Sequence, residues 1–150
     1  MNNVISHSKG ETCQIYILRN VGKFSFRIVD DGVGVLSKVA KHFSLENERH
    51  AVLELSKGKI TTDPSHHTGD GLFFVSRFFD RFILESSGLA WKHNLKNGKW
   101  SVTPVNRKKG TSVFLEINTL SNKSLKNMMK EYSANGRMIF NRTCIPVLLS

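Results

Sequence analysis

The feature that most constrains the fold is a repeated alternation of apolar and polar residues. In Cys13 to Leu18 and again in Phe24 to Val29 every second residue is apolar, and the turn-like residues Asn20 to Gly22 stand between them. A period of two is typical of strands with one buried face, so we predict a β-hairpin here. The same period recurs in four later segments, predicted as an antiparallel meander: Arg81 to Ser86, Leu89 to Leu95, Trp100 to Val105 and Ser112 to Ile117.

Apolar residues at helical spacing fall between and after these strands. Gly58 follows one such segment at the place where a helix would end. Strands combined with helices predict an α+β fold class, a two-layer sandwich of a mixed, mostly antiparallel sheet with helices on one face. The predicted helices are Val35 to Phe43, Glu46 to Leu55, Leu72 to Phe79 and Leu120 to Tyr132, while the short apolar run Ile145 to Leu149 indicates no particular structure.

Size and charge restrict the class of protein. The 150 residues fit one compact unit, and no repeat, low-complexity tract or linker marks a boundary. No apolar run approaches the roughly 18 to 20 residues that cross a bilayer, and residues 1–10 do not resemble a secretion signal, so we expect a cytoplasmic protein with no membrane partner. The chain has 22 Lys and Arg residues and 12 Asp and Glu residues, which gives a net charge of +10. This charge favours a nucleotide, a nucleic acid or an acidic protein surface as partner.

The cysteines and the paired histidines do not indicate a disulfide or metal site. Cys13 and Cys144 are the only cysteines and lie far apart in the sequence, so we expect two buried reduced thiols. His66 and His67 are adjacent, and adjacent side chains in a loop diverge. No set of cysteines or carboxylates completes a metal site beside them, so we interpret the pair as part of a polar loop.

A glycine-containing segment, Asp30-Asp31-Gly32-Val33-Gly34, lies between the second predicted strand and the first predicted helix. A carboxylate at this position could accept a hydrogen bond from an exocyclic amine, and the glycines would let the backbone approach a flat ring closely. The alternative is a plain turn with two solvated aspartates.

Two further glycine sites stand at the starts of elements. Gly69-Asp70-Gly71 precedes the apolar helix that begins at Leu72, where unpaired N–H groups and the helix dipole favour phosphate. The segment lacks the lysine and hydroxyl residue of a P-loop, and a plain loop is the alternative. Gly110-Thr111 opens the last predicted strand, where a turn glycine is the alternative.

Near the start of the chain, Asn3 and His7 are four residues apart and would share one face of a helix. An amide oxygen there could ligate Mg²⁺ directly or through water. The alternative is a pair of polar residues on a frayed terminus.

Taken in order, these four sites resemble the N, G1, G2 and closing Gly-Thr boxes of the GHKL ATPases, the gyrase, histidine-kinase and MutL type with the Bergerat fold. The resemblance covers roughly Asn2 to Ile117. The nearest type is the small bacterial ATP-binding domain related to anti-sigma-factor serine kinases and histidine-kinase catalytic domains, including those with a STAS-like domain downstream. In this comparison Glu48 to Phe79 stands where the family has its ATP lid.

The resemblance implies ATP and Mg²⁺ as cofactors and assigns roles by position. Asn3 would hold Mg²⁺ against the phosphates and Asp30 would recognise the adenine amino group. Gly32 and Gly34 would pass under the nucleotide, and Thr111 would lie by the adenine. The implied nucleotide-binding residues are Asn3, His7, Asp30, Gly32, Gly34, Gly69, Gly71, Leu72 and Thr111, with Asn3 as the metal ligand, Gly69 and Gly71 at the lid hinge, and no residue assigned to catalysis.

The resemblance also defines a domain and a departure. We predict an ATP-binding domain over 1–120 with a lid at about 44–71, followed by a C-terminal helix and tail over 121–150. In hydrolytic members a glutamate lies one helical turn before the N-box asparagine, a position that would precede Met1 here. We therefore expect a form shortened at the N-terminus, a bacterial regulatory or signalling module with weak or no hydrolysis, because general-base help is missing.

Two alternative functions follow from the same residues. The first is a nucleotide-gated interaction module without catalysis, whose partner is a regulatory protein, a STAS-like domain or a second copy of the chain. The second is a nucleic-acid-binding domain, which we rank below the ATP-binding domain and the interaction module. The reason for this ranking is that clusters of basic and aromatic residues on strands are more often a solvated strand face. Nucleic-acid binding would rest on the net charge and on a group of basic and aromatic residues: Trp91, Lys92, Lys96, Lys99, Trp100, Arg107, Lys108 and Lys109.

Overall fold

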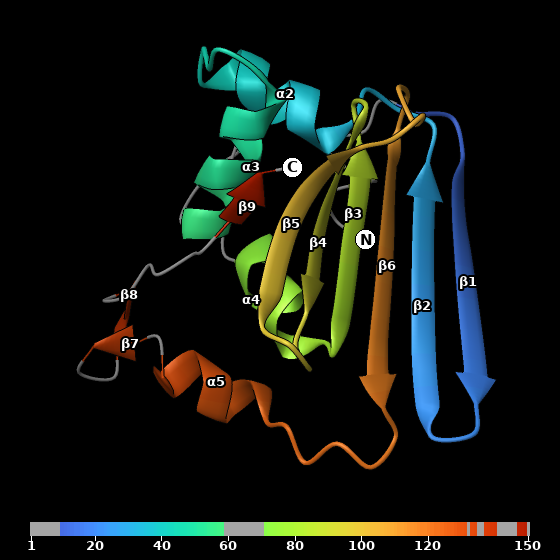
Figure 1. Cartoon of the computed structure of the whole chain (residues 1–150), viewed down its shortest axis with the longest axis vertical. Coiled ribbons are helices and arrows are strands. Elements are labelled where there is room, and N and C mark those ends of the chain that lie inside the picture. The colour runs from blue at the N-terminus through green and yellow to red at the C-terminus, as the bar shows by residue number, and fades with distance from the viewer. Residues whose placement is uncertain (1–9, 59–70, 132, 135–136, 141–146, 150) are drawn as a thin grey trace.

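The computed structural model describes residues 10–58, 71–131, 133–134, 137–140 and 147–149 (Figure 1). Its main feature is a seven-stranded sheet in the order β1-β2-β6-β3-β4-β5-β9. All neighbouring strands are antiparallel except β9, which runs parallel to β5. The strands of this sheet are β1 (Cys13–Asn20), β2 (Lys23–Asp30), β3 (Arg81–Ser86), β4 (Leu89–Asn94), β5 (Lys99–Pro104), β6 (Thr111–Asn118) and β9 (Val147–Leu149).

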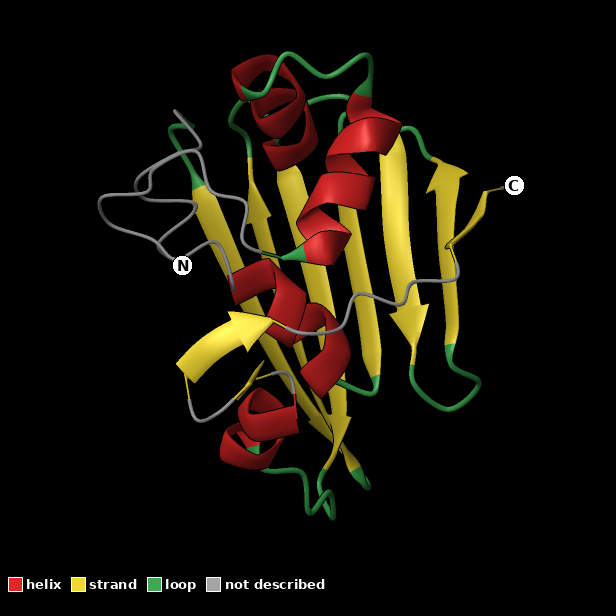
Figure 2. Ribbon diagram, turned by 90° about the vertical axis from the view of Figure 1, so that its left-hand side faces the viewer, coloured by secondary structure: helices red, strands yellow, loops and turns green. Residues whose placement is uncertain are grey.

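The described helices pack in a layer against one face of this sheet, as Figure 2 shows. The predicted α+β class, a two-layer sandwich with a mostly antiparallel sheet, is therefore confirmed. None of the helices in the described ranges has the length and apolar character needed to span a bilayer. The remaining elements are α2 (Val35–His42), α3 (Glu48–Lys57), α4 (Gly71–Phe78), α5 (Leu125–Glu131) and a separate small pair, β7 (Ser133–Ala134) with β8 (Arg137–Phe140).

The predicted meander is wrong in one respect, the position of β6. This strand lies between β2 and β3 rather than beside β5. The connection that makes this possible passes the β3–β4 turn, where Gly88 N–H donates to the Arg107 carbonyl at 2.6 Å and Val105 N–H donates to the Gly88 carbonyl at 2.8 Å. Alternation predicts a strand with one apolar face but does not predict its neighbours in the sheet.

The helix boundaries follow from local capping. Asn47 starts α3 by accepting hydrogen bonds from the N–H groups of Arg49 and His50, at 3.0 and 3.2 Å, and Gly58 ends it with φ +75°. The helix predicted from Leu120 begins only at Leu125, because Leu120 N–H is held in a turn by the Asn118 side chain at 2.8 Å. Tyr132, its predicted end, lies outside the described residues.

The hydrophobic core lies between the helices and the three strands β3, β4 and β5, which we call the covered strands. Phe82, Leu84 and Trp91 are fully buried there. The rings of Trp91 and Trp100 stack at 5.7 Å, and His93 stacks on Trp100 at 3.9 Å. Core side chains from the helix layer complete the cluster: Leu36, Val39, Ala40, Ala51, Val52 and Leu55.

The first two strands, which we call the open hairpin, contrast with this core. The β1–β2 hairpin forms as predicted, with Asn20 paired to Lys23 across the turn. Every residue of β1 is nevertheless exposed. Cys13 is exposed as well, so the prediction that it is buried is wrong, because an edge strand without a covering layer cannot bury a side chain. Cys144 lies outside the described residues.

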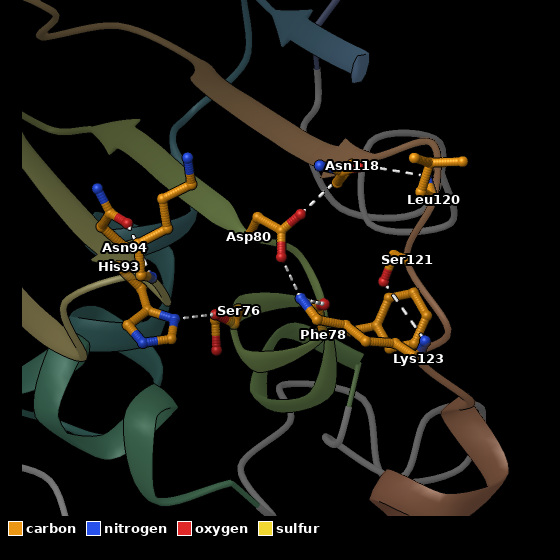
Figure 3. A network of polar contacts seen from close by, with 10 residues as sticks. Ser76, Phe78, Asp80, His93, Asn94, Asn118, Leu120, Ser121 and Lys123 are labelled. Atoms are coloured by element: carbon orange, nitrogen blue, oxygen red, sulfur yellow. Dashed lines mark hydrogen bonds and ion pairs between the residues drawn. The ribbon is translucent and has the colours of Figure 1, made fainter. Parts of the chain in front are cut away.

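A polar network at the end of α4 ties the helix layer to the sheet (Figure 3). Asp80 accepts hydrogen bonds from the Asn118 N–H at 2.7 Å and from the Lys123 ammonium, which also donates to the Phe78 carbonyl at 2.9 Å. Partial burial of Asp80 disfavours its ionised form, but the hydrogen bonds and the charge of Lys123 outweigh this and lower its pKa. These contacts hold the segment that follows β6 against the end of α4.

Candidate functional site

The loop after β2 contains a buried carboxylate with an unused acceptor. Asp30 is the last residue of β2 and is only 5% exposed. Its Oδ1 accepts a hydrogen bond from the Gly32 N–H at 2.9 Å, and no described residue donates a hydrogen bond to Oδ2. Oδ2 is not among the described side-chain atoms that are buried without a hydrogen-bond partner, so it is open to solvent and can accept a hydrogen bond from one more donor.

The loop is held in place by a second glycine loop. Gly110 N–H donates to the Gly32 carbonyl at 2.8 Å, so the segment before β6 is joined to the segment after β2. Gly110 has φ +70°, and a Cβ atom at this position would overlap the carbonyl oxygen of Asp30. The close approach therefore requires glycine at position 110.

Side-chain hydroxyls cap the N-terminus of α2. Val35 N–H donates to Thr111 Oγ1 at 3.0 Å, and the N–H groups of Leu36 and Ser37 donate to the hydroxyls of Ser86 and Ser87 at 3.4 and 3.2 Å. These hydroxyls come from the end of β3, the β3–β4 turn and the start of β6, so they join these three places to the helix. The first N–H groups of α2 are thus satisfied within the protein and are not available to a phosphate.

The neighbouring carboxylate, Asp31, has a separate role. Its Oδ1 accepts a hydrogen bond from the Thr12 N–H at 3.0 Å. This hydrogen bond from Thr12 is the main reason why the pKa of Asp31 is lowered. Asp31 therefore fastens the chain that leads into β1, and it provides a natural control for Asp30.

The structure brings together four of the nine residues that the resemblance implied. Asp30, Gly32, Gly34 and Thr111 converge at one end of the sheet through the contacts described above. Gly34 has φ +86°, and a Cβ there would lie 2.8 Å from the Ser86 hydroxyl. Sequence reasoning missed Ser86 and Ser87, although a Ser-Ser-Gly turn between two strands is the signal that could have found them.

The remaining predicted site residues are either apart from this group or undescribed. Gly71 begins α4 as an exposed residue, and Leu72 packs against the hydrophobic core. Within the described ranges no hydrogen bond links either residue to the Asp30 loop. Five residues lie outside the described residues, and these are the predicted Asn3, His7 and Gly69 together with the paired His66 and His67.

Metal ions and nucleic acids would require other groups of side chains than those around Asp30. Among the residues that the structure describes, no three His, Cys, Asp or Glu side chains gather as a metal site. Trp91 and Trp100 are buried in the core, at 0% and 7% exposure, so neither can stack on a base. Without these two aromatic side chains, the basic and aromatic group named in the sequence consists only of charged residues on strands and loops.

Comparison with known proteins adds no assignment. No protein-family model matches the chain, and no curated protein matches it significantly.

Proposed function

We propose that this chain is a cytoplasmic nucleotide-binding module of the GHKL type, which takes ATP with Mg²⁺ and serves a regulatory or signalling role. The observation that carries the proposal is Asp30, a buried carboxylate with one oxygen held by the Gly32 N–H and the other without a described donor. It lies at the base of a glycine loop, which is where the resemblance would set the adenine amino group.

The chemistry of the loop supports an amine donor rather than a cation. No Lys or Arg forms a described ion pair with Asp30. A neutral amine such as the adenine N6 group would satisfy Oδ2 without bringing a second charge into a buried site. The Gly32 hydrogen bond fixes the carboxylate orientation in advance, so little ordering would be lost on binding.

Thr111 and the glycines supply the rest of the cradle. Thr111 uses its hydroxyl as an acceptor for Val35, which leaves the hydroxyl hydrogen to donate to a ring nitrogen or to a bridging water. Gly32 and Gly34 present backbone without side chains beside the carboxylate. In the proposal the phosphates and Mg²⁺ are bound by Asn3 and by the Gly69 to Gly71 segment.

Calorimetric titration of the full chain with ATP, with and without Mg²⁺, tests the proposal. Asp30→Asn replaces an ionised acceptor and introduces a donor, and hydrogen bonds to charged groups contribute about 1.5–3 kcal/mol. The expected loss of ATP affinity is therefore roughly ten- to hundredfold. The matched control is Asp31→Asn, which removes the same charge from the adjacent residue and should bind ATP like the wild type.

The choice of base provides a second arm. Guanine presents a carbonyl where adenine has its amino group, so GTP should bind more weakly than ATP to the wild type, and Asp30→Asn should narrow this difference. Absence of ATP binding by a folded wild-type chain, or equal losses in the Asp30 and Asp31 variants, would reject the proposal. Measuring phosphate release at saturating ATP then separates an ATPase from a nucleotide-gated interaction module.

A further inference from the structure

The outer edge of the sheet is formed by β1, an eight-residue strand with an unusual exposure pattern. Its apolar side chains are exposed on both faces: Ile15 and Ile17 on the helix side, Tyr16 and Leu18 on the other. Ile17 and Leu18 are each 60% exposed. A covering helix could bury only one of these faces, whereas another strand beside β1 would extend both.

The backbone of β1 has hydrogen-bonding groups available for an added strand. The two-residue turn makes Asn20 and Lys23 a hydrogen-bonded pair, so alternate residues of β1 point their N–H and C=O groups away from β2. These outward residues are Cys13, Ile15, Ile17 and Arg19. The pairing with β2 runs without a bulge from Cys13 to Asn20, and β1 contains no proline, so a single charge, Arg19, is the one device against edge pairing in this strand.

The opposite edge differs, because β9 pairs along β5 through residues Val147 to Leu149. In Figure 1, β1 forms the free margin of the sheet on the side away from the helices α2 and α3. Of the two margins of this sheet, only the β1 side offers a long strand with no described partner. An interaction that continues the sheet is therefore directed to β1.

We propose that β1 pairs antiparallel with β1 of a second copy of this chain, which joins the two sheets about a two-fold axis that passes by Tyr16. A two-fold axis perpendicular to the sheet places the helix layers of both copies on the same side of the joined sheet. It requires that each β1 residue lie opposite a β1 residue of the other copy whose side chain is on the same face. Centring on Tyr16 satisfies this rule and pairs all four outward residues: Cys13 lies opposite Arg19, and Ile15 opposite Ile17. A centre at Ile17 would use only three of the four.

The side chains of β1 are compatible with this register. On the helix face Ile15 meets Ile17 twice, and on the other face the two Tyr16 side chains meet with Gln14 beside Leu18. Arg19, the single charged residue of β1, faces Cys13 rather than its own copy. The strand therefore fits itself without opposing like charges, although each whole chain carries +10.

The net charge gives the interface a distinguishing salt response. Two chains of charge +10 repel, so salt that screens this repulsion should strengthen the pairing of copies. Association of β1 with an acidic partner would weaken as salt is added. The salt response thus separates a second copy from a partner held by charge.

Sedimentation velocity across a wide concentration series tests the proposal on the full chain. The wild type should shift from monomer to dimer as concentration rises, and more readily at higher salt. Ile17→Lys sets a charge on an outward residue inside the pairing and should raise the dimer dissociation constant by roughly a hundredfold or more. Val21→Lys is the matched control, because Val21 is fully exposed in the turn beyond β1 and should dimerise like the wild type.

A crosslink reads the register directly. With both native cysteines changed to serine, Tyr16→Cys should form an intermolecular disulfide under mild oxidation, because the two copies of residue 16 face each other on the axis. Circular dichroism of each variant verifies that the monomer is folded. A wild type that stays monomeric at every concentration and salt, or an Ile17→Lys chain that dimerises as well as Val21→Lys, would overturn the proposal.

Discussion

The covered strands and the open hairpin share one sequence pattern but differ in what they bury. On β3, Phe82 and Leu84 have no exposed surface. On β1, the residues of the same alternating type are exposed throughout, including Ile17 on the helix side at 60%. The difference is the presence of the helix layer, because α2, α3 and α4 pack over β3 and β4 (Figure 2).

This comparison shows that strands with the same alternating sequence pattern can differ in how much they contribute to stability. The covered strands gain from side-chain burial, to which each large apolar residue contributes about 1.5–3 kcal/mol. The open hairpin is held mainly by its backbone ladders, β1 to β2 and β2 to β6, with Phe26 reaching the ring of Phe79 at 6.3 Å. We therefore expect the hairpin to be the less stable part of the sheet.

The largest expected effect is the difference in stability loss between two leucine-to-alanine variants, one in each region. Leu84→Ala removes a fully buried side chain from the covered strands and should cost about 2–5 kcal/mol of unfolding free energy. Leu18→Ala removes the same atoms from an exposed position and should cost less than about 0.5 kcal/mol beyond any strand-propensity change. Urea denaturation of both variants measures the difference, and equal losses would break the comparison.

A smaller difference between matched variants is expected where the two regions meet, at Gly110, because the cost of a positive φ is shared by both variants of the pair. Ala at a position with φ near +70° costs about 1–2 kcal/mol by itself. In Gly110→Ala the new Cβ also meets the Asp30 carbonyl, which adds about 1–3 kcal/mol. Gly98→Ala is the matched variant, because Gly98 has φ +64° and open space around it. Thermal unfolding should rank Gly110→Ala as clearly less stable, and an equal ranking would mean that the junction is loose.

The mildest expected effect is a pH dependence that originates in the covered strands. Burial lowers the pKa of His93, and the nearby charges of Arg77 and Lys123 lower it further. The hydrogen bond that its Nδ1 donates to the Ser76 carbonyl at 2.8 Å opposes this shift without reversing it. The folded chain thus binds this proton less readily than the unfolded chain, whose histidine titrates near 6.5. The stability linked to neutral His93 should be complete above this pH and should fall as the pH drops towards the lowered folded value.

Denaturation midpoints from about pH 8 to about pH 5 check this expectation. His93→Gln supplies an amide donor that does not titrate, so its midpoint should vary less over the same range. A wild type and a variant with the same pH slope would contradict the assignment. The lowered pKa of Asp80 acts in a separate window, because its contribution is complete above its ordinary value near 3.8 and is lost only in stronger acid.

Much of the fold could be predicted because the evidence for it is local. Alternation found the strands, helical spacing found α2, α3 and α4, and Gly58 marked the end of α3 correctly. The order of the strands was not accessible, because the place of β6 depends on contacts between distant loops such as Gly88 with Arg107. Exposure of Cys13 was missed for a related reason, since a strand pattern does not say whether a helix covers it.

The site was predictable only in part. Asp30, Gly32 and Thr111 were found because a carboxylate and glycines at element ends are recognisable in sequence. The hydroxyls of Ser86 and Ser87 were not, because their capping of α2 crosses fifty positions of the chain. A helix N-terminus can be recognised in a sequence, but a cap supplied from another part of the fold leaves no local pattern.

The stacked indoles of Trp91 and Trp100 have a practical consequence for optical experiments. They are the two tryptophans of the chain, and both belong to the covered strands. Intrinsic fluorescence therefore reports melting of that region and is nearly blind to fraying or self-association of β1. A tryptophan introduced at Tyr16 would add a second emitter, and comparing the two melting curves by wavelength would show whether the sheet unfolds in one step or opens first at its free margin.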